Sequence, residues 1–192
     1  HGPWAATYGA KAAIIAGCST TSNILAGTMY DYGSTGTMAH SYVTAFGCSV
    51  EGEHKSFDTY IKTHKGEPLI LLIDTYDTLR CGILNAIRSF KENGIDDTYQ
   101  WGYGIRLDSG DLAYLSKKAR KMLDEAGFED AVISASNDLD EYLIDSLKVQ
   151  GATITSWGVG THLITAKDNP SFGGVYKLAA IQDENGNFIP KV

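Results

Sequence analysis

The sequence contains no hydrophobic run long enough to cross a membrane. The longest run of large apolar residues lies at 69–73 (LILLI), whereas a membrane-spanning helix needs about 20 apolar residues. Residues 1–4 also lack the basic region and the apolar core of a secretory signal peptide. We therefore expect a protein with no membrane partner and no secretory leader.

Cysteine is scarce as well. The chain has three cysteines, Cys18, Cys48 and Cys81, at wide spacings and with no C-x-x-C pair. An odd number without such a pair argues against a disulfide framework or a cysteine-rich zinc site, and it indicates reduced thiols. The expected location is the cytoplasm.

Basic residues are outnumbered. The chain has 16 Lys and Arg against 23 Asp and Glu, which gives a formal net charge of −7. Nucleic-acid-binding proteins need a basic surface, so this composition argues against a nucleic-acid partner. It does not exclude a small anionic ligand, because one arginine or one helix N-terminus can override the global charge locally.

What the chain does contain is an alternation of strand and helix patterns. Its 192 residues, 43% of them hydrophobic, suffice for one sizeable domain. Strands are predicted at 69–73, 101–106, 131–134 and 152–156, and helices at 5–16, 23–31, 41–48, 55–64, 78–93, 111–126 and 138–148. This order predicts a parallel α/β sheet, either open and doubly wound or closed into a barrel. Residues 174–181 and 188–189, around a turn at 184–187, predict a β-hairpin.

Polar side chains gather where the predicted strands end. They lie at His40, 74–77, 106–111, 134–138 and 158–161. Because the carboxyl ends of parallel strands share one face, we expect these clusters to converge, as in an enzyme whose site lies on the βα loops. The alternative is that all of them only form helix caps and turns.

The turn RLDSGD at 106–111 is the hardest to explain as a cap. Ser109 or Asp111 would be enough to cap the following helix. Capping does not account for Arg106 and Asp108 together. This turn therefore favours a binding function.

Two further clusters allow both interpretations. Asp74 directly follows a strand and could bind Mg²⁺ or sugar hydroxyls, whereas Asp77 or Thr75 would cap the next helix. His40 suits proton or phosphoryl transfer near neutral pH. On this cluster alone, however, a single histidine at a helix start is more often structural.

Amide and hydroxyl side chains mark two more positions. Asn137 could reach a ribose hydroxyl, although Asn137 or Asp138 is also a candidate helix cap, with Glu141 completing a capping box from Asp138. Ser22 and Asn23 could bind a polar ring substituent or cap the next helix.

The turn GVGT at 158–161 is rich in small residues. The backbone N–H groups of Gly158 and Gly160 and the hydroxyl of Thr161 suit a phosphate group. The alternative is an ordinary tight turn, because this short motif is weak evidence on its own.

Taken together, six stretches resemble nicotinate phosphoribosyltransferases, in order and over nearly the whole chain. They are TTSNILAG (20–27), GTMAHSYV (36–43), LIDTYDTL (72–79), GIRLDSGDL (104–112), SASNDLDEY (134–142) and GVGTHLITAKDNPSFGGVYKLAAI (158–181). The blocks IRLDSGDL and GVGTHLITA are the most diagnostic.

The resemblance implies a fold and a domain organisation. The fold would be an irregular TIM-like α/β barrel of the type II phosphoribosyltransferases, here partial, over residues 1–170. Residues 171–192 would form a β-hairpin leading into a second domain. The chain has no initiator methionine and lacks the family's first barrel strand, its arginine-rich stretch and its ring-stacking aromatic. We therefore expect an excerpt of a longer protein that is a poor catalyst alone.

The resemblance also implies the reaction. Nicotinate and phosphoribosyl pyrophosphate would give nicotinate mononucleotide and pyrophosphate, coupled to ATP hydrolysis, in NAD salvage. The implied catalytic residues are His40 as phosphoacceptor, Asp74, Arg106 and Asp108, with Mg²⁺ held by the two aspartates. The implied substrate-binding residues are Ser22, Asn23, Thr37, Ser109 and Asn137, with Gly158, Gly160 and Thr161 at the 5′-phosphate. A homodimer would complete the site across its interface.

Two alternatives remain at this point. A nicotinamide-specific relative shares these motifs but tends to carry an acidic residue where this chain has Ser22, so Ser22 and Asn23 favour nicotinate. A non-catalytic remnant of the fold would be marked by loss of His40, Asp74 or Arg106, and all three are present.

Overall fold

The computed structural model describes residues 2–165 and 177–190. These residues form two compact units. Unit 1 holds residues 2–36, 138–140 and 159–165, and unit 2 holds residues 37–137, 141–158 and 177–190. No described helix is long and apolar enough to cross a membrane.

Unit 1 is helical. Its helices are α1 (Gly2–Ile15), α2 (Ile24–Tyr30) and the short α8 (Thr161–Ile164). Helices α1 and α8 are in close contact, since a Cβ added at Gly9 would lie 3.3 Å from the Cβ of Ile164. The small residue at position 9 therefore permits this packing.

Unit 2 is an α/β unit built on a parallel sheet. Its strands are β1 (Leu69–Leu72), β2 (Tyr103–Leu107), β3 (Val132–Ala135), β4 (Ser156–Trp157), β5 (Ala180–Gln182) and β6 (Phe188–Pro190). Its helices are α3 (His40–Ala45), α4 (Val50–Thr63), the π-helical turn η1 (Thr78–Gly82), α5 (Ile83–Glu92), α6 (Leu112–Glu125) and α7 (Glu141–Val149). The predicted α/β class is confirmed.

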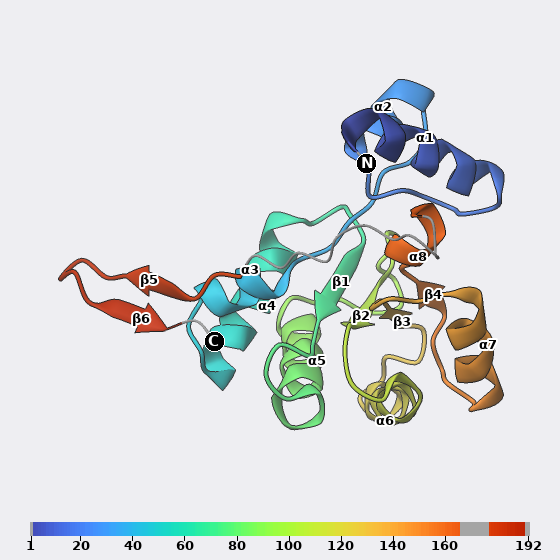
Figure 1. Cartoon of the computed structure of the whole chain (residues 1–192). Helices are drawn as coiled ribbons and strands as arrows, with labels where there is room; N and C mark the ends of the chain where they lie inside the picture. The colour runs from blue at the N-terminus through green and yellow to red at the C-terminus, as the bar shows by residue number, and fades with distance from the viewer. Residues whose placement is uncertain (1, 166–176, 191–192) are drawn as a thin grey trace. The chain divides into compact units, whose positions relative to one another are not determined.

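The main sheet has the order β1-β2-β3-β4, and every pair is parallel (Figure 1). The predicted parallel sheet is therefore confirmed. The four strands are adjacent in the order in which they occur in the sequence. Strand β4 is shorter than the predicted 152–156, because it pairs with β3 only through Ser156 and Trp157.

The core lies around β1 and β2. Leu69, Leu71, Leu72, Ile105 and Leu107 are fully buried, which explains the continuous apolar run of β1. Helix α5 packs on this sheet through an edge-on contact between Phe90 and Tyr103, with ring centroids 5.2 Å apart.

Two glycines let backbones approach closely in unit 2. A Cβ at Gly104 would lie 2.0 Å from the carbonyl oxygen of Val132 in the neighbouring strand. A Cβ at Gly82 would lie 1.8 Å from the carbonyl oxygen of Ile73. Any side chain at either position would collide with backbone, so both glycines are structurally required.

Several helix boundaries differ from the prediction, and two of these differences have a local cause. Helix α4 begins at Val50, earlier than the predicted 55, because the Ser49 hydroxyl accepts a hydrogen bond from Gly52 N at 3.0 Å. Helix α7 begins at Glu141, because Asn137 and Asp138 adopt positive φ angles of 91° and 46°. The predicted cap at Asn137 or Asp138 is therefore wrong.

The C-terminal hairpin forms at the predicted place. Strands β5 and β6 pair antiparallel, with Ile181 opposite Ile189. The beginning of the predicted first strand, 174–176, and the predicted domain boundary at 170 lie outside the described residues. The assignment of this hairpin to a second domain stays a prediction.

Candidate functional site

Asp74 and the 106–111 turn meet at the carboxyl ends of β1 and β2. Leu72 pairs with Arg106, which brings the residues that follow both strands to the same level. Asp74 Oδ2 accepts hydrogen bonds from Asp108 N at 3.0 Å and from the Ser109 hydroxyl at 2.6 Å. The Asp74 side chain is only 1% exposed, so these two donors anchor a buried carboxylate.

His40, the first residue of α3, faces both carboxylates. Its Nε2 lies 3.4 Å from Asp108 Oδ2 and 4.0 Å from Asp74 Oδ1. Its Nδ1 lies 3.1 Å from the Thr75 hydroxyl oxygen. The imidazole is 43% exposed, so it is accessible to a ligand from solvent.

Arg106 points its guanidinium toward the same cluster from β2. Nη2 donates to the carbonyl oxygen of Met38 at 2.7 Å, and Nη1 donates to the Ser136 hydroxyl at 3.3 Å. The Ser136 hydroxyl in turn donates to Asp108 Oδ1. The direct distance from Arg106 Nη1 to Asp108 Oδ1 is 3.8 Å.

These contacts keep Asp108 ionised. The hydrogen bond with His40 lowers the pKa of Asp108 most, and the Ser136 hydroxyl and the Arg106 charge lower it further, against an opposing effect of burial. Asp108 therefore presents a stable negative charge beside the imidazole.

Two buried atoms of the cluster have no hydrogen-bond partner. They are Asp74 Oδ1 and Arg106 Nε. Buried polar atoms are normally paired, and unpaired ones are often explained by a functional role or a missing ligand. The cluster can therefore still accept one hydrogen bond and donate one.

The remaining predicted site residues of unit 2 either donate a hydrogen bond to a backbone carbonyl oxygen or are exposed. The Thr37 hydroxyl donates to the carbonyl oxygen of Ile70 at 2.5 Å. Gly158 N donates to the carbonyl oxygen of Ala135 at 2.8 Å, just beyond β4. Asn137 is exposed in a left-handed turn after β3.

Two predicted caps are confirmed. Asp111 accepts from Tyr114 N at 2.9 Å and caps α6, and Asp77 accepts from Leu79 N and Arg80 N and caps η1. Asp111 is thereby accounted for as a cap, whereas Arg106, Asp108 and Ser109 belong to the cluster around Asp74.

The other four predicted residues belong to unit 1. Asn23 caps α2 by accepting from Ala26 N at 3.0 Å, as its structural interpretation predicted. Ser22 precedes it, and Gly160 and Thr161 form the start of α8. Asn23 therefore has a structural role in this unit.

The sequence did not single out three groups of the cluster as site residues. Ser136 and Thr75 lie in polar stretches after strands, and that position was the signal that could have identified them. The Met38 carbonyl oxygen is a backbone atom, and no sequence pattern predicts its contact with Arg106. These contacts of the charged side chains could therefore be identified only from the structure.

The cluster has few metal ligands. Within residues 2–165 and 177–190, no three His, Cys, Asp or Glu side chains are arranged to hold a metal ion. The two aspartates alone match the way Mg²⁺ is usually bound, through one or two carboxylates with water and substrate phosphates as the other ligands.

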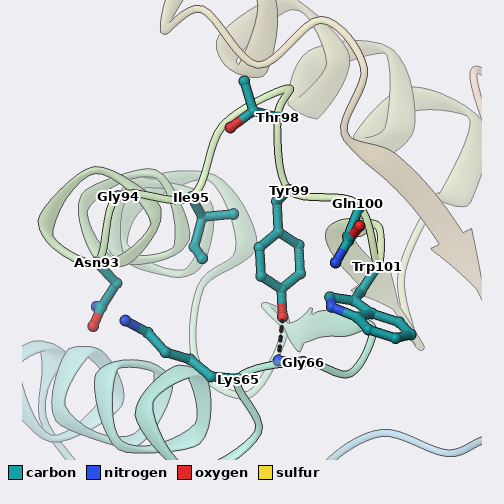
Figure 2. Close-up of a pocket in the computed structure, with 9 residues that line it drawn as sticks. All are labelled: Lys65, Gly66, Asn93, Gly94, Ile95, Thr98, Tyr99, Gln100 and Trp101. Carbon is teal, nitrogen blue, oxygen red and sulfur yellow. Dashed lines mark hydrogen bonds between the residues drawn. The ribbon is translucent and has the colours of Figure 1, made fainter.

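A separate pocket lies at the opposite ends of the strands (Figure 2). It has a volume of about 310 Å³ and is lined by residues that precede β1 and β2, namely 65–66, 93–95 and 98–101. Lys65 is the only charged residue of its lining, and none is a carboxylate. This pocket therefore contains none of the residues that the sequence predicted for the site.

Comparison with known proteins supplies relatives for the chain. No protein-family model matches it. Nicotinate phosphoribosyltransferase of Bacillus subtilis (strain 168) is 56% identical over 188 residues, which cover 98% of this chain and 36% of that protein. Among solved structures, nicotinate-nucleotide pyrophosphorylase from Pyrococcus furiosus has a TM-score of 0.69 over 99% of this chain and 51% of that chain. Human nicotinic acid phosphoribosyltransferase has a TM-score of 0.65 over 74% of this chain and 38% of that chain.

The resemblance indicated by the six sequence motifs is therefore confirmed over nearly the whole chain. Both solved structures are 24% identical to it, so they support the fold alone. The chain spans little more than a third of the length of the first curated relatives that it matches.

Proposed function

We propose that this chain forms part of the catalytic domain of a nicotinate phosphoribosyltransferase. The enzyme transfers a phosphoribosyl group from phosphoribosyl pyrophosphate to nicotinate, with release of pyrophosphate and coupled hydrolysis of ATP. The observation that carries this proposal is that His40, at the start of α3, meets Asp74, Arg106 and Asp108 at the carboxyl ends of the adjacent parallel strands β1 and β2. The name of the Bacillus subtilis relative supplies the reaction.

The charges of the cluster suit this transfer. The transition state resembles a ribosyl cation that is losing pyrophosphate, so carboxylates stabilise the ribose and cations stabilise the anionic groups. Asp108 is ionised and 31% exposed, and it faces the ribose together with Asp74. Arg106 presents a permanently charged fork to a carboxylate or phosphate of the substrates.

His40 is the proposed phosphoacceptor. An imidazole nitrogen attacks the γ-phosphorus of ATP, the bond to the bridging oxygen breaks, and ADP leaves. Support comes from the exposure of the ring and from its contacts with Thr75 and Asp108, which orient both nitrogens. Hydrolysis of this phosphohistidine then couples ATP to the transfer.

Asp74 and Asp108 would hold Mg²⁺ next to the substrate phosphates. Bound there, the metal neutralises the developing charge of the pyrophosphate leaving group. The unpaired Asp74 Oδ1 is the observation that supports a missing cation or donor.

The other substrate contacts follow the family motifs. Gly158, Gly160 and Thr161 hold the 5′-phosphate, and Ser22 and Asn23 contact the nicotinate ring. In the same scheme, Thr37, Ser109 and Asn137 line the substrate site. These assignments rest on the motifs and on general phosphate chemistry.

The proposal also includes a barrel fold, a homodimer and a cytoplasmic location. Strands of a barrel are adjacent in sequence order, as β1 to β4 are here, whereas doubly wound sheets reverse that order at a switch point. The four strands are then consecutive strands of a TIM-like barrel. In a homodimer, the partner copy completes the site.

The test is pyrophosphate release by the full-length protein with phosphoribosyl pyrophosphate, ATP and Mg²⁺. Three reactions contain nicotinate, nicotinamide or neither. We expect release that depends on nicotinate. Release that depends on nicotinamide would favour the nicotinamide-specific alternative, which the curated relatives do not support. No substrate-dependent release would contradict the proposal.

A further inference from the structure

Ser136 separates the arginine of the cluster from its nearest carboxylate. Its hydroxyl accepts from Arg106 Nη1 and donates to Asp108 Oδ1, so it lies between two opposite charges. We propose that Ser136 is a positioning residue that prevents Arg106 and Asp108 from forming a direct hydrogen bond. The charge of Arg106 then stays available to an anionic substrate.

The distances support this role. Direct charge-assisted N–H···O bonds are about 2.7–2.9 Å long. Arg106 Nη1 and Asp108 Oδ1 are 3.8 Å apart, which is beyond hydrogen-bonding distance although only one residue separates them in the sequence. The hydroxyl of Ser136 forms a hydrogen bond with each group and takes the place of a direct hydrogen bond between them.

The sheet holds Ser136 in place. Ser136 N donates to the carbonyl oxygen of Leu107 at 3.0 Å, which continues the pairing of β3 with β2 past Ala135. The side chain has a single rotatable bond to its hydroxyl, so its oxygen is well localised by this backbone. Ser136 is therefore a fixed spacer between the two groups.

The other contacts of Arg106 and Asp108 indicate what would change if the Ser136 hydroxyl were removed. Arg106 Nη2 is held by the Met38 carbonyl oxygen, so the guanidinium stays in the cluster without Ser136. Asp108 Oδ2 faces His40 Nε2 at 3.4 Å. Without the hydroxyl, Asp108 Oδ1 loses its donor and the nearest replacement is Arg106 Nη1. A direct pair would then compete with the substrate for Arg106.

The experiment measures steady-state constants of the full-length protein for nicotinate and for phosphoribosyl pyrophosphate. The variants are Ser136→Ala, Ser136→Cys, Ser136→Thr and Arg106→Lys. Cysteine keeps the shape of serine with a slightly larger atom but is a weak donor, whereas threonine keeps the hydroxyl. Ser146→Ala, which removes an exposed hydroxyl of α7, is the matched control.

We expect Ser136→Ala and Ser136→Cys to raise one KM by roughly 10-fold, with kcat within about threefold of the wild type. That substrate should be the one whose KM also rises in Arg106→Lys. Ser136→Thr should restore the constants to within about threefold, and Ser146→Ala should match the wild type. This pattern would support a role that acts through Arg106.

Other patterns overturn the inference. Wild-type constants in both Ser136→Ala and Ser136→Cys would contradict it. A fall in kcat without a change in KM would also contradict it. So would a rise in the KM of the substrate whose KM is unchanged in Arg106→Lys. The inference rests on the proposed function, and the two fail in different ways. An inactive wild-type protein overturns the function and with it the inference, whereas an active one with unaffected Ser136 variants overturns the inference alone.

Discussion

Asp108, which is partly buried, and Glu53, which is fully buried, are two carboxyl groups of unit 2 whose pKa values shift in opposite directions. The hydrogen bond with His40 lowers the pKa of Asp108, with help from Ser136 and Arg106. Desolvation raises the pKa of Glu53, which is fully buried on α4, against hydrogen bonds that lower it. The surroundings of Asp108 favour its charged form, and those of Glu53 favour its neutral form.

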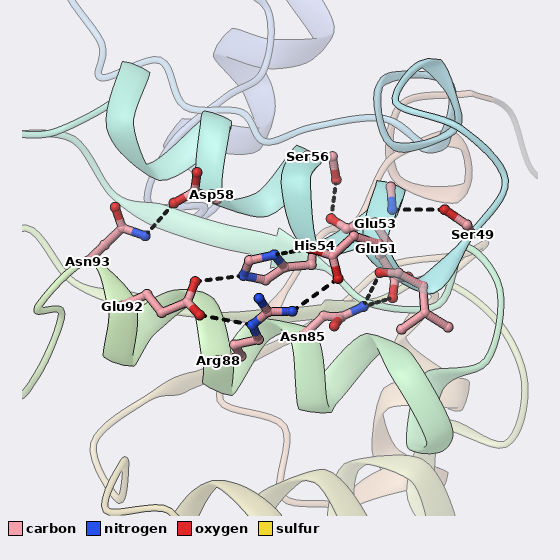
Figure 3. A network of polar contacts seen from close by, with 12 residues as sticks. Ser49, Glu51, Glu53, His54, Ser56, Asp58, Asn85, Arg88, Glu92 and Asn93 are labelled. Atoms are coloured by element: carbon pink, nitrogen blue, oxygen red, sulfur yellow. Dashed lines mark hydrogen bonds and ion pairs between the residues drawn. The ribbon is translucent and has the colours of Figure 1, made fainter.

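The surroundings of Glu53 form a second polar network, between α4 and α5 (Figure 3). Glu53 Oε2 accepts from Asn85 Nδ2 at 2.8 Å, and Asn85 also donates to the carbonyl oxygen of Val50. His54 Nε2 lies 2.9 Å from Glu92 Oε2. These contacts join two helices, so we assign this network to stability.

The comparison shows that a dense group of polar side chains does not by itself mark a site. Both clusters contain a histidine, carboxylates and a buried carboxyl oxygen without a partner. Only the cluster at the strand ends combines an ionised carboxylate with an imidazole that is 43% exposed. His54, by contrast, has a side chain only 8% exposed.

The largest expected effect is on catalysis at Asp108. Asp108→Asn removes the charge beside His40, so nicotinate-dependent turnover of the full-length protein should fall on the order of 10²–10³-fold. Glu92→Gln makes the same chemical change in the α4–α5 network and should leave turnover near the wild-type value. Equal losses in both variants would remove the distinction between the two clusters.

The next effect is on stability at Glu53. Glutamine keeps a side-chain oxygen that can accept from Asn85, whereas Glu53→Ala leaves Asn85 with only the Val50 carbonyl oxygen as a partner. Glu53→Ala should lower the free energy of unfolding by about 1–3 kcal/mol, and Glu53→Gln should lower it by less. Urea denaturation at a fixed pH measures both, and a larger loss for glutamine than for alanine would contradict a stabilising hydrogen bond between Asn85 and position 53.

The wild type and Glu53→Gln together test the direction of the pKa shift of Glu53. Because the pKa is raised in the folded state, the unfolded chain releases the proton first, at its ordinary value of 4.5. The wild type therefore loses stability as the pH rises from 4.5 toward the raised pKa, and Glu53→Gln does not. The stability of the glutamine variant relative to wild type should rise over this range.

The smallest effect is expected at a helix cap. Asp77 accepts from Leu79 N and Arg80 N at the start of η1, so Asp77→Ala should lower the free energy of unfolding by about 1 kcal/mol. Asp77→Asn keeps a capping oxygen and should cost less. An equal cost for asparagine and alanine would show that the cap is not the stabilising interaction.

Much of the fold was predictable from local pattern. Residues 69–73 are apolar because most of them are fully buried, and Asp111 caps α6 because its oxygen accepts from Tyr114 N. The start of α7 was not predictable, since Asn137 and Asp138 adopt positive φ values in a turn that tertiary contacts select.

The candidate site was predictable only in part. The strand ends identified Asp74, Arg106 and Asp108, because parallel strands bring their carboxyl ends together. The hydroxyl of Ser136 and the carbonyl oxygen of Met38 became visible only in three dimensions, since 30 and 68 residues separate them from Arg106. Contacts over such separations leave no periodic signal in the sequence.

The most direct test of the proposed site compares its histidine with the histidine of the α4–α5 network. The full-length protein, His40→Asn and His54→Asn are incubated with ATP labelled in the γ-phosphate, and acid-labile label on the protein is counted. We expect the wild type and His54→Asn to carry the label and His40→Asn to carry none, with circular dichroism spectra unchanged. Undiminished labelling of His40→Asn would contradict the account.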